Sequence, residues 1–225
     1  MKRSIFGSGG LFVIGTDTEV GKTFVACQLA KLLVQRNLRV GVYKPIASGC
    51  ARGEGSPSTD AWLLREAAGV NCELDQVCPQ QFEASAAPPI AAAREGRTID
   101  DRLLLTGANW WLGRCDLLIV EGAGGALSPI SDDQTVLELA VEFGYPVLLV
   151  AANRLGTVNH TLLTLEAIQK RGLQVLAIVL NQLPRDGDNS EQHSSQELIE
   201  RFAPSIPLIP TEELPAWLEL MANSI

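Results

Sequence analysis

Residues 15–23 read Gly-Thr-Asp-Thr-Glu-Val-Gly-Lys-Thr, and this stretch decides the fold class of the chain. A short apolar run typical of a buried strand precedes it, and a helical pattern of apolar residues follows. A strand, a Gly-Lys-Thr turn and a helix together form a phosphate cradle, because backbone N–H groups and the positive end of the helix face the anion. In such a cradle Lys22 reaches the outer phosphates, and the Thr23 hydroxyl can bind a magnesium ion.

The spacing within this stretch is irregular. Five residues separate Gly15 from Gly21, one more than in the usual P-loop, and a strict match would place Gly at position 16. The alternative interpretation is a chance Gly-Lys-Thr at a helix cap. The strand and the helix on either side favour a nucleotide site.

Composition and charge limit the class of protein. The 225 residues are 46% hydrophobic and 20% charged, which is enough for a packed core. The net charge of −8 argues against nucleic acid or an anionic membrane as the main partner. Five cysteines without a CxxC pair favour reduced thiols in the cytoplasm over disulfides or a zinc site. No signal peptide is expected, and the longest apolar runs are too short to span a bilayer.

Strands and helices alternate along the whole chain. This order predicts a single α/β domain over residues 1–225, with a mostly parallel sheet, helices on both faces and a three-layer, P-loop NTPase-like architecture. The predicted strands are 11–14, 39–43, 115–120, 146–151, 175–180 and 207–210. The predicted helices are 21–35, 61–68 with its cap at 58–60, 90–94, 98–112, 132–143, 157–171, 191–202 and 212–221. Loops are predicted over 46–50, 51–58 and 184–190, and the rest of 71–97 is ambiguous.

Ligands bind at the carboxyl ends of the strands in such a sheet. Polar residues gather at these predicted ends: Lys22, Lys44, Glu121, Asn153 and Asn181.

Two carboxylates are candidates for the second magnesium ligand that a P-loop site needs. Glu121 directly follows a predicted strand, and the alternative for it is a solvated strand end. Asp60 is the other candidate, and the alternative for it is a plain helix N-cap. Gly122, Gly124 and Gly125 favour a functional loop after Glu121, because backbone without Cβ atoms can approach phosphates closely.

Lys44 and Asn181 each end a predicted strand. A fixed cation at Lys44 near the γ-phosphate would stabilise the transition state by about 3–4 kcal/mol, whereas the alternative is an exposed loop lysine. The amide of Asn181 could read a purine, or it could cap a helix. Residues 153–156 lack the Asp of the guanine signature, which favours ATP over GTP. The helix start at 156–159 could hold a carboxylate.

Five stretches together resemble dethiobiotin synthetases, in the order found in that family. They are Gly15–Thr23, Tyr43–Gly49, Thr59–Asp60, Val120–Gly125 and Leu155–His160. The irregular spacing in residues 15–23 is the form that this family has. The resemblance covers residues from about 10 to 181.

The resemblance implies an ATP-dependent cyclo-ligase of biotin biosynthesis. Such enzymes carboxylate 7,8-diaminononanoate with CO2, activate the carbamate as a carbamic-phosphoric anhydride and close the ureido ring of dethiobiotin, releasing ADP and phosphate. The resemblance further implies that magnesium assists and that the protein is a homodimer whose partner subunit contributes to the substrate pocket.

The resemblance also implies roles for particular residues. Those assigned to catalysis are Lys44, Lys22 and Thr18. Those assigned to magnesium are Thr23, Asp60 and Glu121. Those assigned to ATP are Glu19, Val20, Gly21, Lys22, Thr23, Phe24, Asp60, Glu121, Gly122, Ala123, Gly124, Asn181 and Gln182. Those assigned to the substrate are Ser48, Gly156, Thr157, Val158 and Asn159, the last four for its far carboxylate across the dimer interface.

The chain departs from the family pattern in two late places. Pro207 stands where the family often has Gly, so we assign no adenine contact to residues 210–211. Residues 184–197 align poorly, and we assign no substrate contact there.

Three other functions are consistent with a P-loop. A regulatory or partitioning ATPase usually carries an extra lysine early in the loop, and residues 15–20 contain none. A small-molecule kinase would leave phosphate on its product. A non-enzymatic scaffold would not need Lys22, Lys44, Asp60 and Glu121 together.

Overall fold

The computed structural model of the protein describes residues 9–50, 59–182 and 190–223, with side chains left out at 190–194 and 222–223. The predicted loop 51–58 and nearly all of the predicted loop 184–190 lie outside these residues. Within the described part of the chain, no helix has the length and apolar character needed to cross a membrane.

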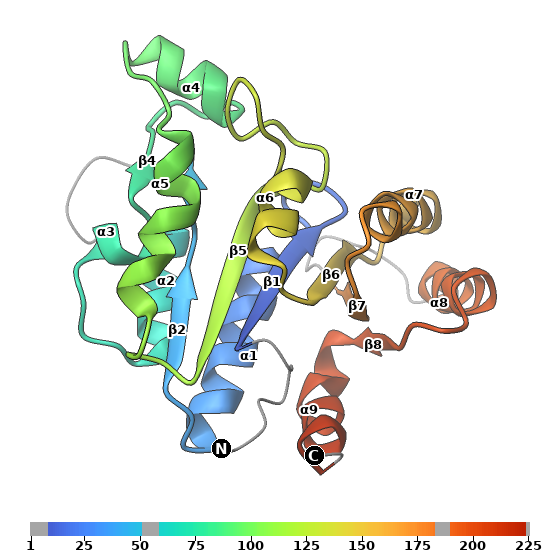
Figure 1. Ribbon diagram of the computed structural model, residues 1–225. Helices are drawn as coiled ribbons and strands as arrows, with labels where there is room; N and C mark the ends of the chain where they lie inside the picture. The colour runs from blue at the N-terminus through green and yellow to red at the C-terminus, as the bar shows by residue number, and fades with distance from the viewer. Residues whose placement is uncertain (1–8, 51–58, 183–189, 224–225) are drawn as a thin grey trace.

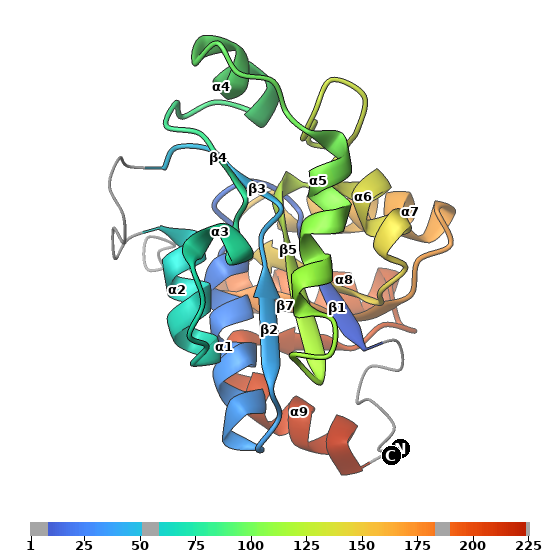
Figure 2. The same cartoon turned by 60° about the vertical axis from the view of Figure 1, so that its left-hand side comes forward.

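A six-stranded parallel sheet with the order β2-β5-β1-β6-β7-β8 forms the centre of the molecule. Its strands are β1 (Gly10–Gly15), β2 (Val40–Tyr43), β5 (Leu117–Gly125), β6 (Val147–Ala152), β7 (Val175–Asn181) and β8 (Leu208–Pro210). Every residue of β1 and β6 is buried, as expected for parallel strands covered on both faces. A separate pair, β3 (Ile46–Ala47) and β4 (Gln80–Gln81), lies beyond the end of β2 (Figure 2).

Helices cover both faces of the sheet (Figure 1). The α1 and α2 helices pack on one face, and α5 and α6 pack on the other. The α-helices are α1 (Lys22–Gln35), α2 (Asp60–Ala68), α3 (Leu74–Val77), α4 (Pro88–Arg94), α5 (Asp101–Thr106), α6 (Val136–Phe143), α7 (Thr157–Lys170), α8 (Ser190–Phe202) and α9 (Leu214–Asn223), and 3-10 turns cover Gly107–Trp111 and Thr211–Glu213. The predicted α/β class with a mostly parallel sheet is confirmed.

Two predicted helices are wrong at their ends. The helix predicted over 98–112 begins only at Asp101, because the Asp100 carboxylate caps it by accepting from the N–H of Leu103. It changes to a 3-10 turn at Gly107, where a Cβ would overlap the Tyr43 hydroxyl. The helix predicted over 132–143 begins at Val136, because Thr135 and Glu138 form a capping box.

Two predicted strand and loop assignments are also wrong. The strand predicted over 115–120 continues to Gly125, so Glu121 lies within β5, where it pairs with Val13. The predicted loop 46–50 contains β3, which pairs with β4 from the ambiguous region. Neither two-residue strand has a periodic pattern that the sequence could reveal.

Candidate active site

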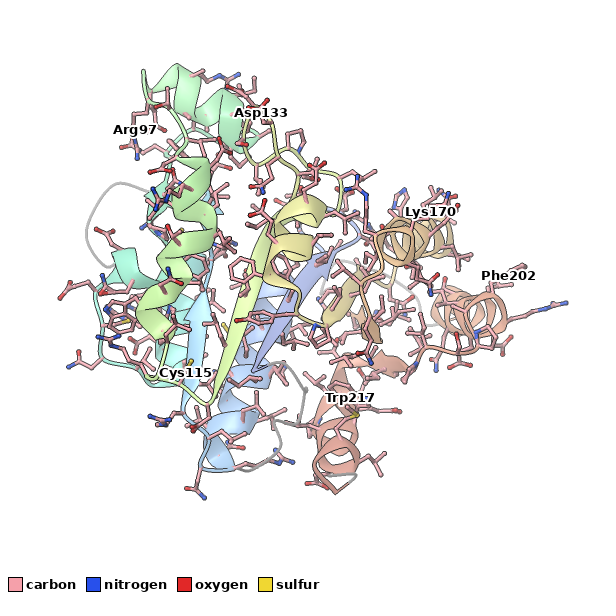
Figure 3. All side chains as sticks on the ribbon, viewed as in Figure 1. Arg97, Cys115, Asp133, Lys170, Phe202 and Trp217 are labelled. Carbon is pink, nitrogen blue, oxygen red and sulfur yellow. The ribbon has the colours of Figure 1, made fainter. Side chains whose placement is uncertain are left out.

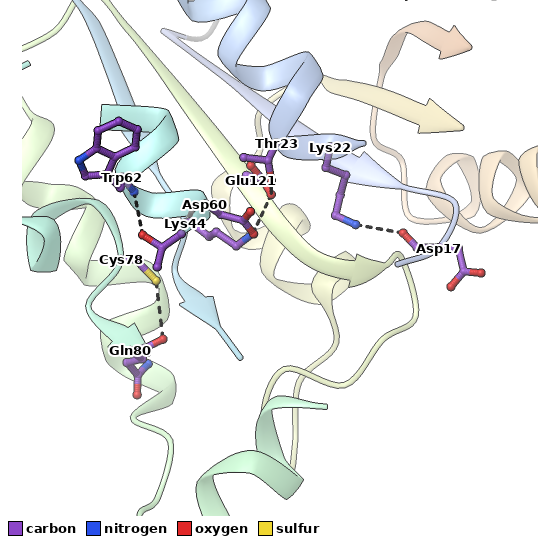
Figure 4. Close-up of polar contacts among 10 residues, drawn as sticks. Asp17, Lys22, Thr23, Lys44, Asp60, Trp62, Cys78, Gln80 and Glu121 are labelled. Atoms are coloured by element: carbon purple, nitrogen blue, oxygen red, sulfur yellow. Dashed lines mark hydrogen bonds and ion pairs between the residues drawn. The ribbon is translucent and has the colours of Figure 1, made fainter. Parts of the chain in front are cut away.

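The P-loop joins the end of β1 to the start of α1. Gly21 has a φ of 91°, a left-handed conformation that lets the chain turn into the helix. Lys22 folds back over the loop, and its Nζ donates to the Asp17 carbonyl at 3.0 Å (Figure 4). The side chain is nearly buried, and this burial lowers the pKa of Lys22 to about 8. The loop therefore holds a lysine over the place where a phosphate would lie.

Four polar side chains meet beside this loop (Figure 4). The Lys44 ammonium contacts Asp60 and donates to Oε1 of Glu121 at 2.7 Å. The Thr23 hydroxyl donates to the same Glu121 oxygen at 2.8 Å. Because β2 and β5 are hydrogen-bonded neighbours and α2 packs on α1, residues distant in sequence converge at the carboxyl end of the sheet.

The cap of α2 shows why Asp60 is available to this cluster. The N-cap is Thr59, whose hydroxyl accepts from the Trp62 N–H at 3.3 Å. Asp60 is the first helical residue and directs its carboxylate to Lys44. The structure therefore contradicts the alternative in which Asp60 is a plain N-cap.

Burial and charge oppose each other in this cluster. Burial alone would lower the pKa of Lys44, but Glu121 and Asp60 outweigh it and the pKa lies above its ordinary value. Burial would raise the pKa of Asp60, but the Lys44 ammonium outweighs it and the pKa lies below its ordinary value. Both groups are therefore charged at neutral pH. The alternatives of a solvated strand end for Glu121 and an exposed loop for Lys44 are wrong, since these residues are 1% and 5% exposed.

The oxygen atoms of the cluster suit a hard divalent cation. Two carboxylates and one hydroxyl are the donors that Mg²⁺ prefers, with phosphate oxygens and water completing six ligands. Oε2 of Glu121 is buried and has no hydrogen-bond partner, so one acceptor is unsatisfied. Among the described residues, no group of three or more His, Cys, Asp and Glu side chains could hold a metal, so a cation here would depend on its nucleotide for further ligands.

A cavity of about 780 Å³ opens onto the P-loop and this cluster. The predicted site residues that line it are Thr18, Glu19, Gly21, Lys22, Thr23, Lys44, Ser48, Asp60, Glu121, Ala123 and Gly124. The predicted site residues outside its lining are Val20, Phe24, Gly122, Gly156, Thr157, Val158, Asn159, Asn181 and Gln182.

Gly122 differs from its neighbour Gly124. A Cβ at Gly122 would lie 2.6 Å from Val136 of α6, so packing against the helix accounts for this glycine. Gly124 has a φ of 82° and lines the cavity. A Cβ at Gly124 would also lie 2.5 Å from Ser128 Oγ, so the close approach of Gly124 to a ligand stays a prediction.

Asn181 lies behind the P-loop and is 2% exposed. Its Nδ2 donates to the Val20 carbonyl at 3.0 Å, and its Oδ1 accepts from the Thr211 hydroxyl at 3.1 Å. A Cβ on Gly21 would overlap the same amide. Asn181 therefore ties the P-loop to β7, and each end of its amide keeps one further hydrogen-bonding position. The next residue, Gln182, is exposed and accepts from Asn153 at 3.4 Å.

Residues 156–159 form the start of α7. Gly156 is the N-cap with a φ of 90°, and no side chain caps the helix. Thr157 is buried with no hydrogen-bond partner for its hydroxyl, and Asn159 is exposed. None of the four lines the cavity, so the structure does not bring them together with the lysine and carboxylate cluster.

The sequence did not indicate one side of the cavity. The chain from the end of β4 to the start of α4 lines it through Gln81, Ser85, Ala86, Ala87 and Pro88, and the loop after β5 adds Ser128 and Pro129. The only signal was the pair Pro88-Pro89, which predicted the start of a helix without indicating which cavity it borders.

The sheet, the loop and the cluster define a P-loop nucleotide-binding α/β protein. A family model described as an AAA domain matches residues 9–213. The chain belongs to the family of ATP-dependent dethiobiotin synthetases, because its similarity to members of that family extends over most of its length.

The relatives have consistent names. The ATP-dependent dethiobiotin synthetase BioD of Rhodopirellula baltica is 41% identical over 91% of this chain and 84% of its own. Those of Anaeromyxobacter dehalogenans and Bacillus subtilis are 44% and 36% identical, over 84% and 89% of this chain and 83% and 85% of their own.

Solved structures at low identity support the fold alone. McdA of Cyanthece has a TM-score of 0.53 at 16% identity and covers 95% of this chain and 92% of its own. The MinC:MinD cell division complex of Aquifex aeolicus has a TM-score of 0.51 at 14% identity and covers 94% of this chain and 86% of its own.

Proposed function

We propose that this protein is an ATP-dependent dethiobiotin synthetase that acts on 7,8-diaminononanoate, CO2 and ATP. One observation carries the proposal: Lys44, Asp60, Glu121 and Thr23 meet beside Lys22 on a single cavity at the P-loop. The named relatives, which match most of the chain, give the reaction that such a site would perform.

In this reaction the protein side chains neutralise negative charge and position the substrate. One amine of the substrate adds CO2 to form a carbamate, a carbamate oxygen takes the γ-phosphoryl group, and ADP leaves. The second amine then attacks the carbamate carbon, and phosphate leaves with the closing of the ring. The ammonium groups of Lys22 and Lys44 neutralise the phosphates and the carbamate, with Thr18 close by. Ser48, which also lines the cavity, contacts the diamine or the carbamate.

Magnesium belongs to the same proposal. Thr23, Asp60 and Glu121 would hold the cation, which supplies charge neutralisation for phosphoryl transfer. Support comes from the donor atoms and from the unsatisfied buried oxygen of Glu121.

ATP would lie along the backbone from Glu19 to Phe24, with Ala123 and Gly124 facing its phosphates. Asn181 would read adenine, with Gln182 beside it. The amide of Asn181 has one donor and one acceptor left, which is the pair that matches N7 and the N6 amino group of adenine.

The far carboxylate of the substrate would bind at Gly156–Asn159 of the partner subunit in a homodimer. These residues lie away from the cavity of their own chain, which supports a site completed across an interface. Leu155 is 93% exposed and Leu163 is 59% exposed, so apolar surface flanks Asn159 on its side of α7. A measured solution mass of a monomer that is active at full rate would exclude this arrangement.

We also propose one domain and a cytoplasmic location, without nucleic acid or membrane as partner. One buried core cluster contains residues from β1 to α9, which supports a single domain. All five cysteines are free thiols, which fits a reducing compartment.

The decisive experiment is a product assay. Purified protein with the diamine, bicarbonate, ATP and Mg²⁺ should form dethiobiotin, ADP and phosphate in equal amounts. ATP turnover that is the same without diamine would indicate a regulatory ATPase, and a phosphorylated end product would indicate a kinase. Either result would exclude the proposal.

A further inference from the structure

One side of the cavity is formed by a short segment, Gln81–Pro88, which we call the wall and whose cavity-lining residues are uncharged. Of its residues, Gln81, Ser85, Ala86, Ala87 and Pro88 line the cavity. It runs from the last residue of β4 to the first residue of α4, beyond the end of β2 (Figure 2). These lining residues are three small apolar residues, one hydroxyl and the amide of Gln81, so they carry no charge with which to bind phosphate, and the apolar residues suit a methylene chain.

Glu95 holds the start of the wall. Its Oε1 accepts from the N–H groups of Glu83 at 2.6 Å and Ala84 at 3.2 Å. Burial would raise the pKa of its carboxyl group, but these two bonds and the Arg97 guanidinium outweigh it and lower the pKa, so the group is charged at neutral pH. A charged acceptor makes each bond stronger than a neutral one would.

Arg97 also holds the start of the wall. Its guanidinium donates to the Gln81 carbonyl at 2.7 Å and to Oε2 of Glu95 at 3.3 Å. It also lies 4.4 Å from the centre of the Phe82 ring, a side chain that is 1% exposed. Figure 3 shows Arg97 beside the short helix α4.

The way α4 ends directs the side chains of Glu95 and Arg97 toward the wall. Gly96 has a φ of 64°, and the N–H groups of Gly96 and Arg97 bond to the carbonyls of Ala93 and Ala92. This is a Schellman motif, which ends the helix and reverses the chain. Glu95 and Arg97 flank the reversing glycine, so both reach back to the wall.

The wall is in turn bonded to the loop that carries Ser48. Phe82 N donates to Ala47 O at 2.9 Å, Cys50 N donates to Phe82 O at 2.9 Å, and Gly49 N donates to Ala84 O at 3.1 Å. A shift of residues 82–84 would therefore move Ser48. The P-loop has no such bond to the wall among the described residues.

We propose that Glu95 and Arg97 are positioning residues for the organic substrate and not for ATP. By fixing the wall they set the distance between its apolar lining and Ser48, and so the width of the channel in which the diamine chain lies. This inference rests on the proposed dethiobiotin synthetase reaction.

The test is a kinetic comparison of Glu95→Ala with wild type. We expect the KM for 7,8-diaminononanoate to rise about tenfold or more, while the KM for ATP stays within about twofold. Glu95→Gln keeps an oxygen that can accept both N–H groups, so its KM for the diamine should lie closer to wild type. Arg97→Met should change the KM for the diamine in the same direction as Glu95→Ala.

The matched control is Glu219→Ala. Glu219 lies on the distant α9 helix and forms an exposed ion pair with Arg36. Neither KM should change there. An equal rise of both KM values in Glu95→Ala, or no rise in either, would overturn the inference.

A measurement on wild type avoids any folding defect of a variant. Hydrogen exchange of residues 81–88 should slow when the diamine alone is added and stay unchanged with ATP alone. Slowing with ATP alone, or no slowing with the diamine in a protein that does form dethiobiotin, would also overturn the inference. Failure of wild type to form dethiobiotin would instead reject the proposed function.

Discussion

Lys44 lies among the three side chains proposed as magnesium ligands. Its ammonium contacts Asp60 and Glu121, and Thr23 donates to the same Glu121 oxygen. The lysine and a divalent cation would therefore compete for the same carboxylates. If these carboxylates held a cation, the Lys44 ammonium would lose both partners and would be free to face the phosphates.

Metal affinity tests this competition. In Lys44→Met, the affinity for Mn²⁺ without nucleotide should rise by about tenfold or more, because the Lys44 ammonium no longer neutralises Asp60 and Glu121. Lys22→Met is the control, because its ammonium donates to a backbone carbonyl and contacts neither carboxylate. A Mn²⁺ titration followed by electron paramagnetic resonance measures both. An equal gain in the two variants would mean that only net charge matters.

Gly21 of the P-loop packs against the side-chain amide of Asn181. In Gly21→Ala the new Cβ would overlap the Asn181 amide, and the residue has a φ of 91°. ATP affinity measured by calorimetry should fall by about tenfold or more, because the loop and the amide must move apart. Gly172→Ala is the control: its φ is 74°, but nothing lies within 4 Å of its Cβ position. Unchanged ATP affinity in Gly21→Ala would contradict the packing described here.

At the scale of the element, the capping box of α6 gives a stability prediction. The Glu138 N–H donates to the Thr135 hydroxyl at 3.4 Å, and the Glu138 carboxylate accepts from the Thr135 N–H at 2.8 Å. Thr135→Ala should lower the free energy of unfolding by about 1 kcal/mol in urea titrations. Thr106→Ala, which removes an exposed hydroxyl within α5, should change it by less than about 0.5 kcal/mol. Equal losses would mean that the cap has no special role.

Elements with strong local signals were predictable from sequence. The β6 and β7 strands are continuous apolar runs, and their predicted ends agree with the structure to within one residue. Elements whose ends depend on contacts with distant parts of the chain could not be predicted from sequence. Near the end of α5 the Tyr43 hydroxyl donates to the carbonyls of Leu103 and Leu104, and no local pattern encodes a contact between residues 60 positions apart.

The candidate active site also has a part that the sequence could predict and a part that it could not. Its charged half could be inferred, since Lys22, Lys44, Asp60 and Glu121 are in motifs next to predicted strand or helix ends. The wall could not be inferred, because its lining residues are chemically ordinary and two ion-paired residues beyond α4 hold it in place.

At the scale of the whole molecule, the thiols give a prediction about pH. Burial raises the pKa of all five, and that of Cys27 rises to about 12. The folded protein therefore binds these protons more tightly than the unfolded chain. The stability this contributes is complete below the unfolded thiol pKa of about 8.5 and is lost as pH rises toward the folded values.

Alkylation measures this protection. At pH 8.5, iodoacetamide should modify the cysteines of the native protein at least about tenfold more slowly than those of the denatured protein, as read by mass spectrometry. The urea-derived free energy of unfolding should also fall between pH 8.5 and 10. Rapid alkylation of Cys27 or Cys78 in folded protein would show that these thiols are not held as described.

The placement of Glu121 within β5 also affects how the protein is made. The hydrogen bond between Glu121 and Thr23 spans 98 positions, and β5 must insert between β1 and β2 before it can form. A chain emerging from the ribosome therefore carries a complete P-loop sequence long before it can form the whole nucleotide site. Since the nucleotide can stabilise only chains that have paired these strands, it acts late in synthesis, after more than half of the protein has left the ribosome.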